Sequence, residues 1–498
     1  MRTFLCATVL TLACATAHAQ VQPPASAPSQ DDPHKPSAHR IAVELTTLDL
    51  MRAKGLISQE EYDSAVRDIG DTAGTQTGDA PTLMLGRWST TLYGFVEADS
   101  IFDSTESFND LAGNTQIART GTYQANNHRL MFGVRNSRIG FRLRAPEYHK
   151  VRASAMLEMD FLGNQPPNAT EAAFFTNPTF RIRHFNLKVE TPIVDVLIGQ
   201  YWQLFGWQST YQPNSVEIQG VPGEVYSRTP QIRLSKTLKP GPLTLELAAA
   251  IMRPPQRDSS YPEGQFGGRI AFNKWTGLAT TGSTGTAIQP LSIAVTADVR
   301  RFALPEFSAN PGKSVDSPIG WGVAVDGLIP ILPARPNKKG NALTLTAEYA
   351  YGVGTADLYT GLNGGVTNPA LPNPTMATPA PTYTPNIDPG LAVFNINGIN
   401  VDLIQWQSYI FGLQYYLPGL KGRGWISANY SHMDSNNSSS HGAANKVRFK
   451  EDWADVNLFG DVTPAVRIGL EYAWFRDQYV DGNAPVNHRV QLSAFYLF

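Results

Sequence analysis

The chain ends with Arg489-Val490-Gln491-Leu492-Ser493-Ala494-Phe495-Tyr496-Leu497-Phe498, in which two kinds of side chain alternate. One face of this stretch carries Val490, Leu492, Ala494, Tyr496 and Phe498, and the other begins with Arg489, Gln491 and Ser493. Successive side chains of a β-strand point to opposite faces, so a period of two indicates a strand. The stretch therefore predicts a strand with one apolar and one polar face.

Similar alternation recurs along most of the chain, in about sixteen segments that are mostly 8–13 residues long. The segments begin near residues 92, 134, 151, 179, 193, 229, 242, 267, 290, 318, 341, 404, 423, 448, 464 and 487. Strands of soluble proteins average about 5–6 residues, whereas a tilted strand needs about 9–11 to cross a bilayer. Strand length and number together predict an all-β fold, a sixteen-stranded antiparallel transmembrane β-barrel.

The connections between these segments alternate in length. Residues 103–133, 162–178 and 200–228 are long connections, whereas 145–150, 191–192 and 239–241 are short. Later connections continue the pattern, with 253–266, 303–317, 353–403, 433–447 and 477–486 long, 418–422 and 460–463 short, and 276–289 and 329–340 intermediate. Bacterial barrels have short periplasmic turns and longer extracellular loops. The alternation therefore predicts a barrel in the outer membrane of a Gram-negative bacterium, with both termini periplasmic.

The chain before the barrel divides into segments of different composition. The predicted parts are a signal peptide at 1–19, a flexible lead at 20–40, a periplasmic helical segment at 41–69, a linker at 70–87 and the barrel at 88–498. The signal peptide ends at a small-x-small cleavage site, Ala17-His18-Ala19, and contains both cysteines of the chain. The mature protein is therefore expected to contain neither a disulfide nor a cysteine-bound metal.

Composition and motifs argue against several function classes. The formal net charge of −2 does not fit a nucleic-acid-binding protein with a broad basic face. The histidines are scattered without the spacing of a metal site, so no metal or other cofactor is expected. No Gly-x-Ser-x-Gly motif or phosphate-binding loop is present, so no catalytic residues are expected.

Several motifs resemble the DcaP-like family of outer-membrane porins. Residues 92–103, Leu-Tyr-Gly-Phe-Val-Glu-Ala-Asp-Ser-Ile-Phe-Asp, are similar to the first strand of that family, and residues 136–141, Asn-Ser-Arg-Ile-Gly-Phe, resemble a second-strand motif of many porins. Residues 198–205, Ile-Gly-Gln-Tyr-Trp-Gln-Leu-Phe, with 220–223, Gly-Val-Pro-Gly, and 228–233, Arg-Thr-Pro-Gln-Ile-Arg, resemble the family most specifically. The resemblance is clear over about 88–250 and looser beyond, where the long 353–403 insertion departs from the family pattern.

The resemblance implies a homotrimer of sixteen-stranded barrels in outer-membrane lipid. Each barrel would take up small anionic solutes, dicarboxylates and aromatic dicarboxylates among them, by passive diffusion. The helical segment would be a periplasmic extension, which either forms a trimeric coiled coil through Ile41, Leu45 and Leu48, contacts peptidoglycan, or stays disordered. A terminal aromatic residue such as Phe498 resembles the signal by which outer-membrane barrels are recognised for assembly.

Strand alternation predicts which charged side chains face the lumen. Arg138, Arg142 and Arg144 alternate with apolar residues, and Arg233 lies between Ile232 and Leu234. Arg181 and Arg183 share parity with apolar Phe185, so either a β-bulge near His184 resets the register or these arginines lie above the membrane; the bulge is favoured. The predicted substrate or pore-lining residues are Arg138, Arg142, Arg144, Arg183, Arg228, Arg233, Glu97, Asp99, Tyr201 and Trp202.

Two interpretations of the lumenal charges remain open. The arginines and the carboxylates Glu97, Asp99, Glu158 and Asp160 can pair across neighbouring strands and brace the wall. Alternatively, the arginines form a basic field that concentrates anions in a narrow pore. The aromatic loop 200–228 is predicted to fold inward as a constriction, although it could instead cap the outside or lie at a trimer interface.

The sequence thus favours an outer-membrane porin for small hydrophilic, anionic solutes. An alternative is a structural or adhesive barrel that binds through its long loops 353–403 and 433–447. A third class, a lipase or protease built on a barrel, would need a Ser/His or acidic constellation at the rim, which the sequence does not supply.

Overall fold

The structure is a computed structural model that describes most of the predicted barrel. The described residues are 51, 82–85, 88–113, 116–163, 178–217, 220–254, 261–305, 315–362, 391–394, 401–440 and 447–498. The chain divides into two compact units, Met1–Ile69 and Gly70–Phe498. The predicted signal peptide and lead lie outside the described residues, as does the helical segment except for Met51, which is helical. Within the described residues, no helix is long and apolar enough to cross a membrane.

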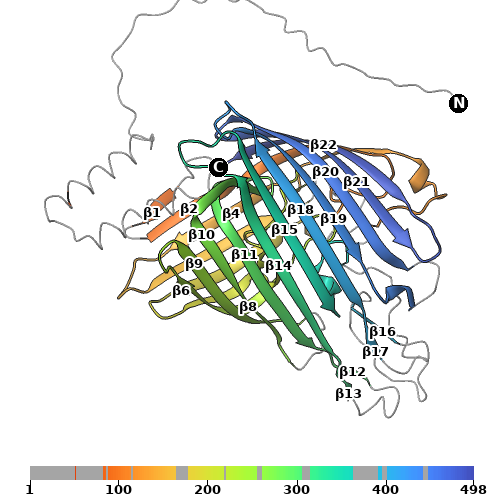
Figure 1. The fold of residues 1–498 in the computed structure, drawn as a ribbon, viewed down its shortest axis with the longest axis horizontal. Helices are drawn as coiled ribbons and strands as arrows, with labels where there is room; N and C mark the ends of the chain where they lie inside the picture. The colour runs from red at the N-terminus through yellow and green to blue at the C-terminus, as the bar shows by residue number, and fades with distance from the viewer. Residues whose placement is uncertain are drawn as a thin grey trace, which may run out of the picture. The chain divides into compact units, whose positions relative to one another are not determined.

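Sixteen antiparallel strands form a closed barrel in the second unit (Figure 1). They are β2 (Trp88–Asp103), β3 (Arg129–Gly133) with β4 (Arg138–Arg144), β5 (Arg152–Asp160), β6 (Arg181–Glu190), β7 (Asp195–Trp202), β8 (Arg228–Leu238), β9 (Leu243–Met252), β10 (Glu263–Thr281), β11 (Gly285–Arg301), β14 (Ile319–Leu332), β15 (Ala342–Val353), β18 (Gln405–Tyr416), β19 (Gly424–Asp434), β20 (Arg448–Thr463), β21 (Val466–Tyr479) and β22 (Val486–Leu497). Because β3 and β4 both pair with β2, they are two halves of one barrel strand.

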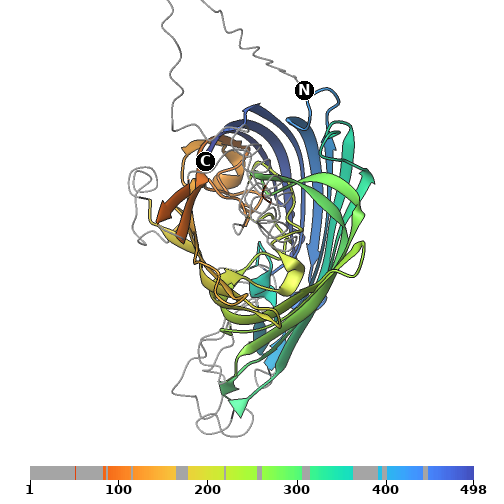
Figure 2. The ribbon, with the colours of Figure 1, turned by 90° about the vertical axis from the view of Figure 1, so that its left-hand side faces the viewer.

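Short elements lie at the connections. β1 (Thr82–Leu85) pairs with the start of β2, β12 (Leu304–Pro305) with β13 (Val315–Asp316), and β16 (Ala392–Phe394) with β17 (Val401–Leu403). Single 3-10 turns are η1 (Gln124–Asn126), η2 (Phe205–Trp207), η3 (Ala356–Leu358) and η5 (Ser438–Ser440). Of these, η2 and η3 belong to segments that lie inside the ring of strands, where they appear in yellow and teal (Figure 2).

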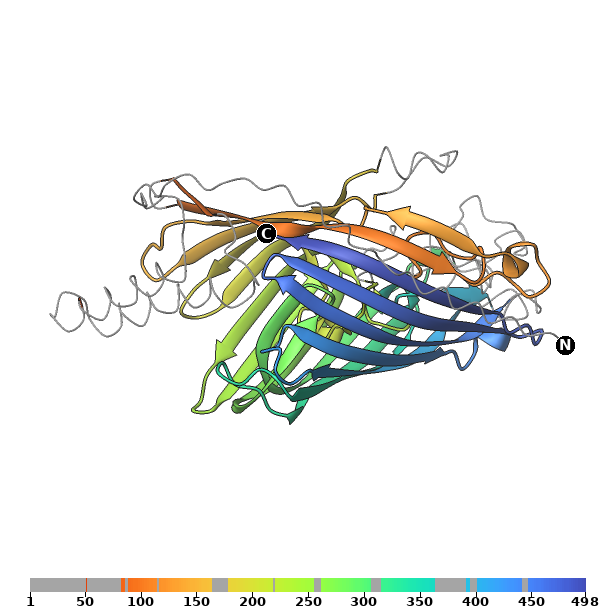
Figure 3. The ribbon, with the colours of Figure 1, turned by 90° about the horizontal axis from the view of Figure 1, so that it is seen from above.

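The terminal strand predicted from the alternation closes the barrel. β22 pairs with β2 from Phe95 opposite Leu497 to Asp103 opposite Arg489, and the two strands lie side by side in Figure 3. The Phe498 amide donates to the Gly94 carbonyl at 3.1 Å, and the Gly94 amide donates to the Phe498 carbonyl at 2.9 Å. The last residue therefore completes the backbone hydrogen bonding that a closed barrel requires.

All sixteen strands predicted from sequence are present, and each begins within about five residues of the expected position. One predicted connection is wrong. Residues 276–289 were expected to be a connection of intermediate length, but β10 runs to Thr281 and β11 starts at Gly285, which leaves a three-residue turn. The alternation was missed there because Gly and Thr, which carry little hydrophobic contrast, fill both faces of this segment.

The two faces of the wall differ as the alternation predicts. On β22, Val490, Leu492 and Tyr496 are 42–56% exposed, whereas Arg489, Gln491 and Ser493 are fully buried. Similar exposed apolar rows follow the outward side of the other strands, including Ile293 and Val295 on β11. The apolar side chains therefore point outward and the polar ones inward, the reverse of a soluble protein.

Candidate functional site: the interior of the barrel

The described part of the connection between β7 and β8, residues 203–217 and 220–227, folds into the barrel; we call it the inward loop. At its start, the amides of Leu204 and Phe205 donate to Gln265 Oε1 on β10, at 2.9 and 2.8 Å. The Gly206 amide donates to Thr296 Oγ1 on β11 at 2.9 Å. Gln265 and Thr296 are buried inward-facing residues, so the wall supplies acceptors for loop amides that would otherwise be buried without partners.

The middle of the inward loop crosses to the opposite wall at Asn214. Its side-chain Oδ1 accepts the indole N–H of Trp425 at 2.8 Å, and its carbonyl accepts the Ser427 hydroxyl at 2.7 Å. Asn429 Nδ2 donates to the same carbonyl at 2.9 Å. All three partners lie on β19, whereas the loop begins against β10 and β11, so the loop spans the lumen.

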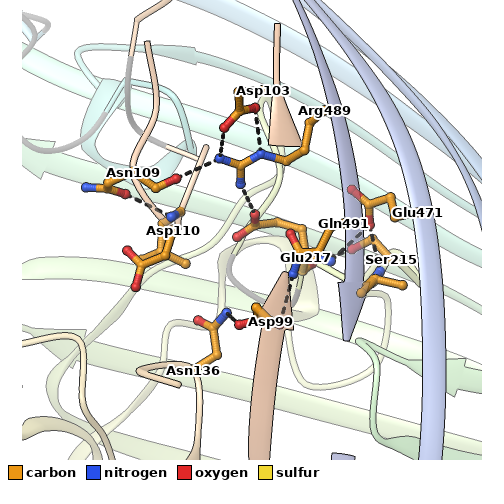
Figure 4. Close-up of polar contacts among 12 residues, drawn as sticks. Asp99, Asp103, Asn109, Asp110, Asn136, Ser215, Glu217, Glu471, Arg489 and Gln491 are labelled. Carbon is orange, nitrogen blue, oxygen red and sulfur yellow. Dashed lines mark hydrogen bonds and ion pairs between the residues drawn. The ribbon is translucent and has the colours of Figure 1, made fainter. Parts of the chain in front are cut away.

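An ion-pair cluster fixes the next part of the inward loop to the seam between β22 and β2 (Figure 4). Arg489, fully buried, donates to Glu217 Oε2 and to Asp103 Oδ2, both at 2.9 Å. Glu471 Oε2 on β21 accepts the amides of Val216 and Glu217, at 2.7 and 2.9 Å. The loop is therefore bound to the wall through both side-chain charges and backbone amides.

Carboxylates outnumber cations in this cluster. Asp99 accepts hydrogen bonds from Ser493, Gln491 and Asn136, and Glu97 lies beside it with no hydrogen-bond donor on its carboxylate among the described residues. Burial, joined by the charges of Glu471 and Asp99, raises the pKa of Glu217 to about 8, although Arg489 acts in the opposite direction.

The predicted pore-lining role of Glu97 and Asp99 is wrong in one respect. Both side chains point inward, as predicted, but Glu97 is 0% exposed and Asp99 is 4% exposed. The inward loop and the neighbouring strands cover these residues, so neither meets solute directly. Sequence alternation gives the face on which a side chain lies, but it does not show what covers that face.

A second segment, residues 354–362 after β15, also folds inward and pairs with the inward loop. Val225 and Tyr359 form an antiparallel bridge, in which the Tyr226 amide donates to the Leu358 carbonyl at 2.9 Å. The Thr360 amide donates to the Glu224 carbonyl at 2.8 Å. A buried apolar cluster backs the bridge and includes Phe205, Val225, Phe302, Leu358, Tyr359, Leu362, Ile404 and Trp406. Two connections therefore form one body in the lumen, while residues 363–390 and 395–400 lie outside the described residues.

The predicted bulge near His184 is confirmed. Glu158 pairs with His184 and Met159 pairs with Ile182, so Arg183 is an extra residue on β6. The bulge turns both Arg183 and His184 inward, where they are 1% and 4% exposed, and returns Phe185 to the outward side.

Some of the predicted pore arginines brace the wall. Arg183 Nε donates to Glu158 Oε1 at 2.8 Å and its Nη1 to Asp160 Oδ2 at 3.1 Å. Arg138 lies 3.6 Å from the same Glu158 oxygen. The interpretation of cross-strand pairing therefore holds for these residues, and the prediction that Arg183 lines the pore is wrong because it is buried in ion pairs.

Three other predicted arginines have no carboxylate ion pair within the described part of the chain. Arg142 lies over the Tyr93 ring at 4.1 Å, Arg228 over the Trp202 ring at 4.6 Å, and Arg233 over the Tyr201 ring at 5.6 Å. All three residues are partly buried, and the Arg228 Nη1 atom is buried without a hydrogen-bond partner in the described residues. The fourth, Arg144, is exposed at the end of β4.

The two predicted aromatic residues form part of the wall at the root of the inward loop. Trp202 is 8% exposed and packs edge-on against Tyr226 with ring centroids 4.8 Å apart, so the prediction that it lines the pore is wrong. Tyr201 is half-buried, and its ring centroid lies 4.9 Å from that of His184. Trp202 is buried because the loop turns back over it, a contact that alternation does not predict.

The sequence did not single out Tyr226, but the pKa of its phenol reflects the positive charge of this region. Its hydroxyl accepts from Arg183 Nη2 at 3.2 Å. Burial would raise the pKa of Tyr226, but the guanidinium groups of Arg183 and Arg228 outweigh that effect and lower it to about 8.

Sequence analysis also did not identify Asn214. Both Tyr226 and Asn214 lie in a loop without a periodic pattern, and their residue types alone do not indicate what they contact. Among the described residues, no group of acidic, histidine or cysteine side chains could hold a metal ion.

Matches to this chain come from the comparison with solved structures. No protein-family model matches the chain, and no curated protein matches it in sequence. The outer-membrane channel DcaP of Acinetobacter baumannii aligns with 82% of this chain and 97% of its own, at 18% identity and a TM-score of 0.58. The anion-selective porin from Comamonas acidovorans aligns with 82% of this chain and 100% of its own, at 12% identity and a TM-score of 0.46.

At this identity, the likeness to DcaP establishes the fold alone. It agrees with the closed barrel and with the strand motifs from which the resemblance was inferred. The chain therefore has the fold of the DcaP outer-membrane channel.

Proposed function

We propose that the protein is an outer-membrane porin through which small hydrophilic, anionic solutes diffuse passively. One observation supports this most directly: a closed sixteen-stranded barrel with an apolar outside surrounds a polar interior into which a loop folds. An apolar outer surface fits lipid, and a polar interior narrowed by a loop fits a selective aqueous path. The proposal includes no catalytic residue and no cofactor.

The proposed orientation in the membrane rests on the lengths of the connections between strands. The short turns and Phe498 lie at one end of the barrel, which we call the short-turn end, and the long connections lie at the other. We place the short-turn end and both termini in the periplasm, because barrels of this kind have short periplasmic turns. A homotrimer and a contact between the N-terminal segment and peptidoglycan belong to the same proposal.

The preference for anions rests on an excess of arginine along β4 to β8. Arg142, Arg228 and Arg233 have no carboxylate ion pair in the described residues, whereas Glu158 and Asp160 are already bound by Arg183. An uncompensated positive charge beside a narrow aqueous path attracts anions and repels cations. A planar guanidinium group also suits carboxylate solutes such as dicarboxylates, because it can donate two parallel hydrogen bonds to one carboxylate.

The triple variant Arg142→Ser, Arg228→Ser and Arg233→Ser tests this selectivity. The parent is expected to pass anions in preference to cations, and the variant is expected to lose a factor of about three to ten in the permeability ratio. Reversal potentials under a salt gradient in planar bilayers measure the ratio.

Arg152→Ser is the matched control, because Arg152 is 50% exposed at the end of β5 and pairs with Glu190. A cation-selective parent, or a triple variant with unchanged selectivity, contradicts the proposed arginine filter. A parent that inserts but shows no conductance instead favours the structural or adhesive barrel.

The selectivity is also expected to depend on pH through Tyr226. With a pKa of about 8, its phenol is neutral at pH 7 and gains a negative charge as the pH rises to 9. That charge lies beside Arg183 and Arg228, with Arg138 and Glu224 also nearby, so it reduces the positive field. The anion-to-cation permeability ratio is therefore expected to fall between pH 7 and 9.

Tyr226→Phe should remove the contribution of Tyr226 to this pH dependence. Glu217→Gln is the comparison variant, because Glu217 also has a pKa of about 8 but lies at the Arg489 cluster. A permeability ratio that falls equally with pH in the parent and in Tyr226→Phe rules out the phenol as its source.

A further inference from the structure

The hairpin formed by β10 and β11 leaves the barrel wall before it turns. β10 pairs with β9 as far as Phe272, opposite Leu243, and the pairing with β11 is interrupted between Phe272 and Thr276. Pairing then resumes at Thr276 opposite Pro290, and continues to Thr281 opposite Gly285. A bulge bends a strand, and Pro290 cannot donate a ladder hydrogen bond, so both features lie where the hairpin departs from the sheet. We call residues Thr276–Pro290 the hairpin tip.

The hairpin tip is long enough to cross much of the lumen. Its first strand, Thr276–Thr281, has six residues, and at about 3.3 Å per residue it reaches about 20 Å. Leu278, Ala279, Thr280 and Ser283 are each at most 2% exposed, Gly277 is also buried, and the other residues of the tip are partly buried. A turn at the rim of a barrel would instead be exposed to solvent.

Near its base, the hairpin tip is bound to the inner side of the adjacent strands. The Ala334 amide donates to the Thr276 carbonyl at 2.8 Å, and the Thr344 hydroxyl donates to the Leu278 carbonyl at 2.8 Å. Thr344 is fully buried on β15, two strands beyond β11 in the sheet. The tip therefore runs across the inward face of the wall.

At its middle, the hairpin tip is held by one inward-facing side chain of β18. The Thr280 amide donates to Gln414 Oε1 at 2.7 Å, and Gln414 Nε2 donates to the Thr280 carbonyl at 3.0 Å. Gln414 thus satisfies both backbone groups of Thr280, as a neighbouring strand would. The Tyr416 and Thr280 hydroxyls are 2.7 Å apart, which adds a third contact.

At its turn, the hairpin tip meets both the far wall and the inward loop. Arg467, fully buried on β21, donates to the Ser283 carbonyl and also lies 3.4 Å from the Thr286 hydroxyl. Asn214 Nδ2 of the inward loop donates to the Gly282 carbonyl at 2.5 Å. The hairpin tip therefore extends from β11 to β21, and touches there the loop that enters from the opposite end.

Apolar side chains fill the space beneath this crossing. Leu278 of the hairpin tip belongs to one buried cluster with Val216 of the inward loop and the wall residues Phe95, Ala334, Ala342, Tyr416, Trp425, Phe459 and Phe495. Buried apolar clusters exclude water, so solute cannot pass through this part of the cross-section. The remaining path must run around it.

We propose that the hairpin tip is a second constriction, at the short-turn end, which sets the largest solute that the channel admits. It acts in series with the inward loop, and Gln414 and Arg467 are the residues that position it. This inference rests on the proposed function as a diffusion channel. Solutes selected by charge near Arg142, Arg228 and Arg233 would then be selected by size where the hairpin tip meets Asn214.

The first test replaces Gly277–Gln289 with Asn-Gly, a two-residue turn that suits a β-hairpin. The variant is expected to have at least about twice the single-channel conductance of the parent, because a shortened constriction leaves a wider path. It should also admit larger neutral sugars in liposome swelling, which measures the size limit independently of charge. An unchanged conductance and size limit overturns the hairpin tip as a constriction.

A second pair of variants keeps the chain length and covers the case in which the shortened protein does not fold. Gln414→Ala removes the two contacts to Thr280, and is expected to increase both conductance and current fluctuations in the open channel. Gln407→Ala, on the same strand, is the matched control, since Gln407 donates to Asp434 and not to the hairpin tip. Identical currents in these two variants overturn the proposed positioning role.

The experiment separates the inference from the proposed function. A conducting parent whose shortened variant conducts equally keeps the channel and overturns the second constriction. A silent parent whose shortened variant conducts supports the constriction and contradicts an open diffusion channel. If both insert and neither conducts, the hairpin tip is not what limits flow, and the channel proposal fails with it.

Discussion

Arg489→Ala is expected to lower the unfolding temperature of the barrel by several degrees. Arg489 is fully buried and bridges Asp103 on β2 with Glu217 of the inward loop, both at 2.9 Å. Removing one partner of a buried ion pair leaves an uncompensated charge and costs about 3–5 kcal/mol. Here Asp103 loses its ion-pair partner and Glu217 loses a hydrogen-bond donor, at the seam where the barrel closes.

The measurement is the temperature at which the detergent-solubilised barrel unfolds, followed by circular dichroism or by its shift in mobility on a gel. A fall of several degrees is expected for a domain of this size. Arg489→Lys should recover only part of the loss, because a lysine cannot donate the paired hydrogen bonds that Arg489 makes to Asp103.

His488→Ala is the matched control, because His488 is the preceding residue on β22 but is exposed and bonds to Tyr472. Arg489→Ala should also release Glu217 and increase current fluctuations through the channel, which His488→Ala should not. An unfolding temperature for Arg489→Ala equal to that of His488→Ala would falsify the anchoring role.

Gly94→Val is expected to prevent assembly of the barrel. Gly94 exchanges backbone hydrogen bonds with Phe498, and a Cβ placed on it would lie 2.2 Å from the Arg138 carbonyl oxygen. That atom belongs to the backbone of β4, so it can move only if the strand pairing opens. The φ angle of +152° at Gly94 adds strain for any other residue.

Assembly is measured by the yield of heat-modifiable protein in the outer-membrane fraction and by refolding into detergent. Gly460→Val, on β20, is the matched control, because a Cβ on Gly460 meets nothing within 4 Å. Gly460→Val should fold as the parent does, whereas Gly94→Val should give almost no folded barrel. Equal yields for the two variants would show that the closing contact tolerates a side chain.

The interior of the barrel combines two charge environments that the sequence does not separate. Along β4 to β8, Arg142, Arg228 and Arg233 have no carboxylate ion pair among the described residues. Around the seam, Glu97, Asp99, Glu217 and Glu471 gather near Arg489, which forms an ion pair with Glu217. Glu97 and Asp99 share the inward face of the wall with Arg142 and Arg233, so sequence alternation alone gave these four residues the same pore-lining role.

Part of the candidate site followed from local pattern. The bulge at Arg183 was predicted because two arginines shared parity with Phe185, a conflict that an extra residue resolves. The inward course of the loop after β7 was predicted from its length and its aromatic residues. Neither pattern indicated Asn214, whose contacts to Trp425 and Gly282 join residues far apart in the chain.

The sequence by itself determined the sixteen strands and their two faces, including those of the stretch that ends at Phe498. These properties depend on a period of two, which each strand carries in its own residues. Only the tertiary structure decided which lumenal charges are buried, that Arg183 is neutralised, and that the hairpin tip crosses the lumen. Those outcomes depend on contacts between residues far apart in the chain, such as Arg489 and Glu217, which are 272 residues apart. No local pattern encodes which distant groups a closed barrel brings together.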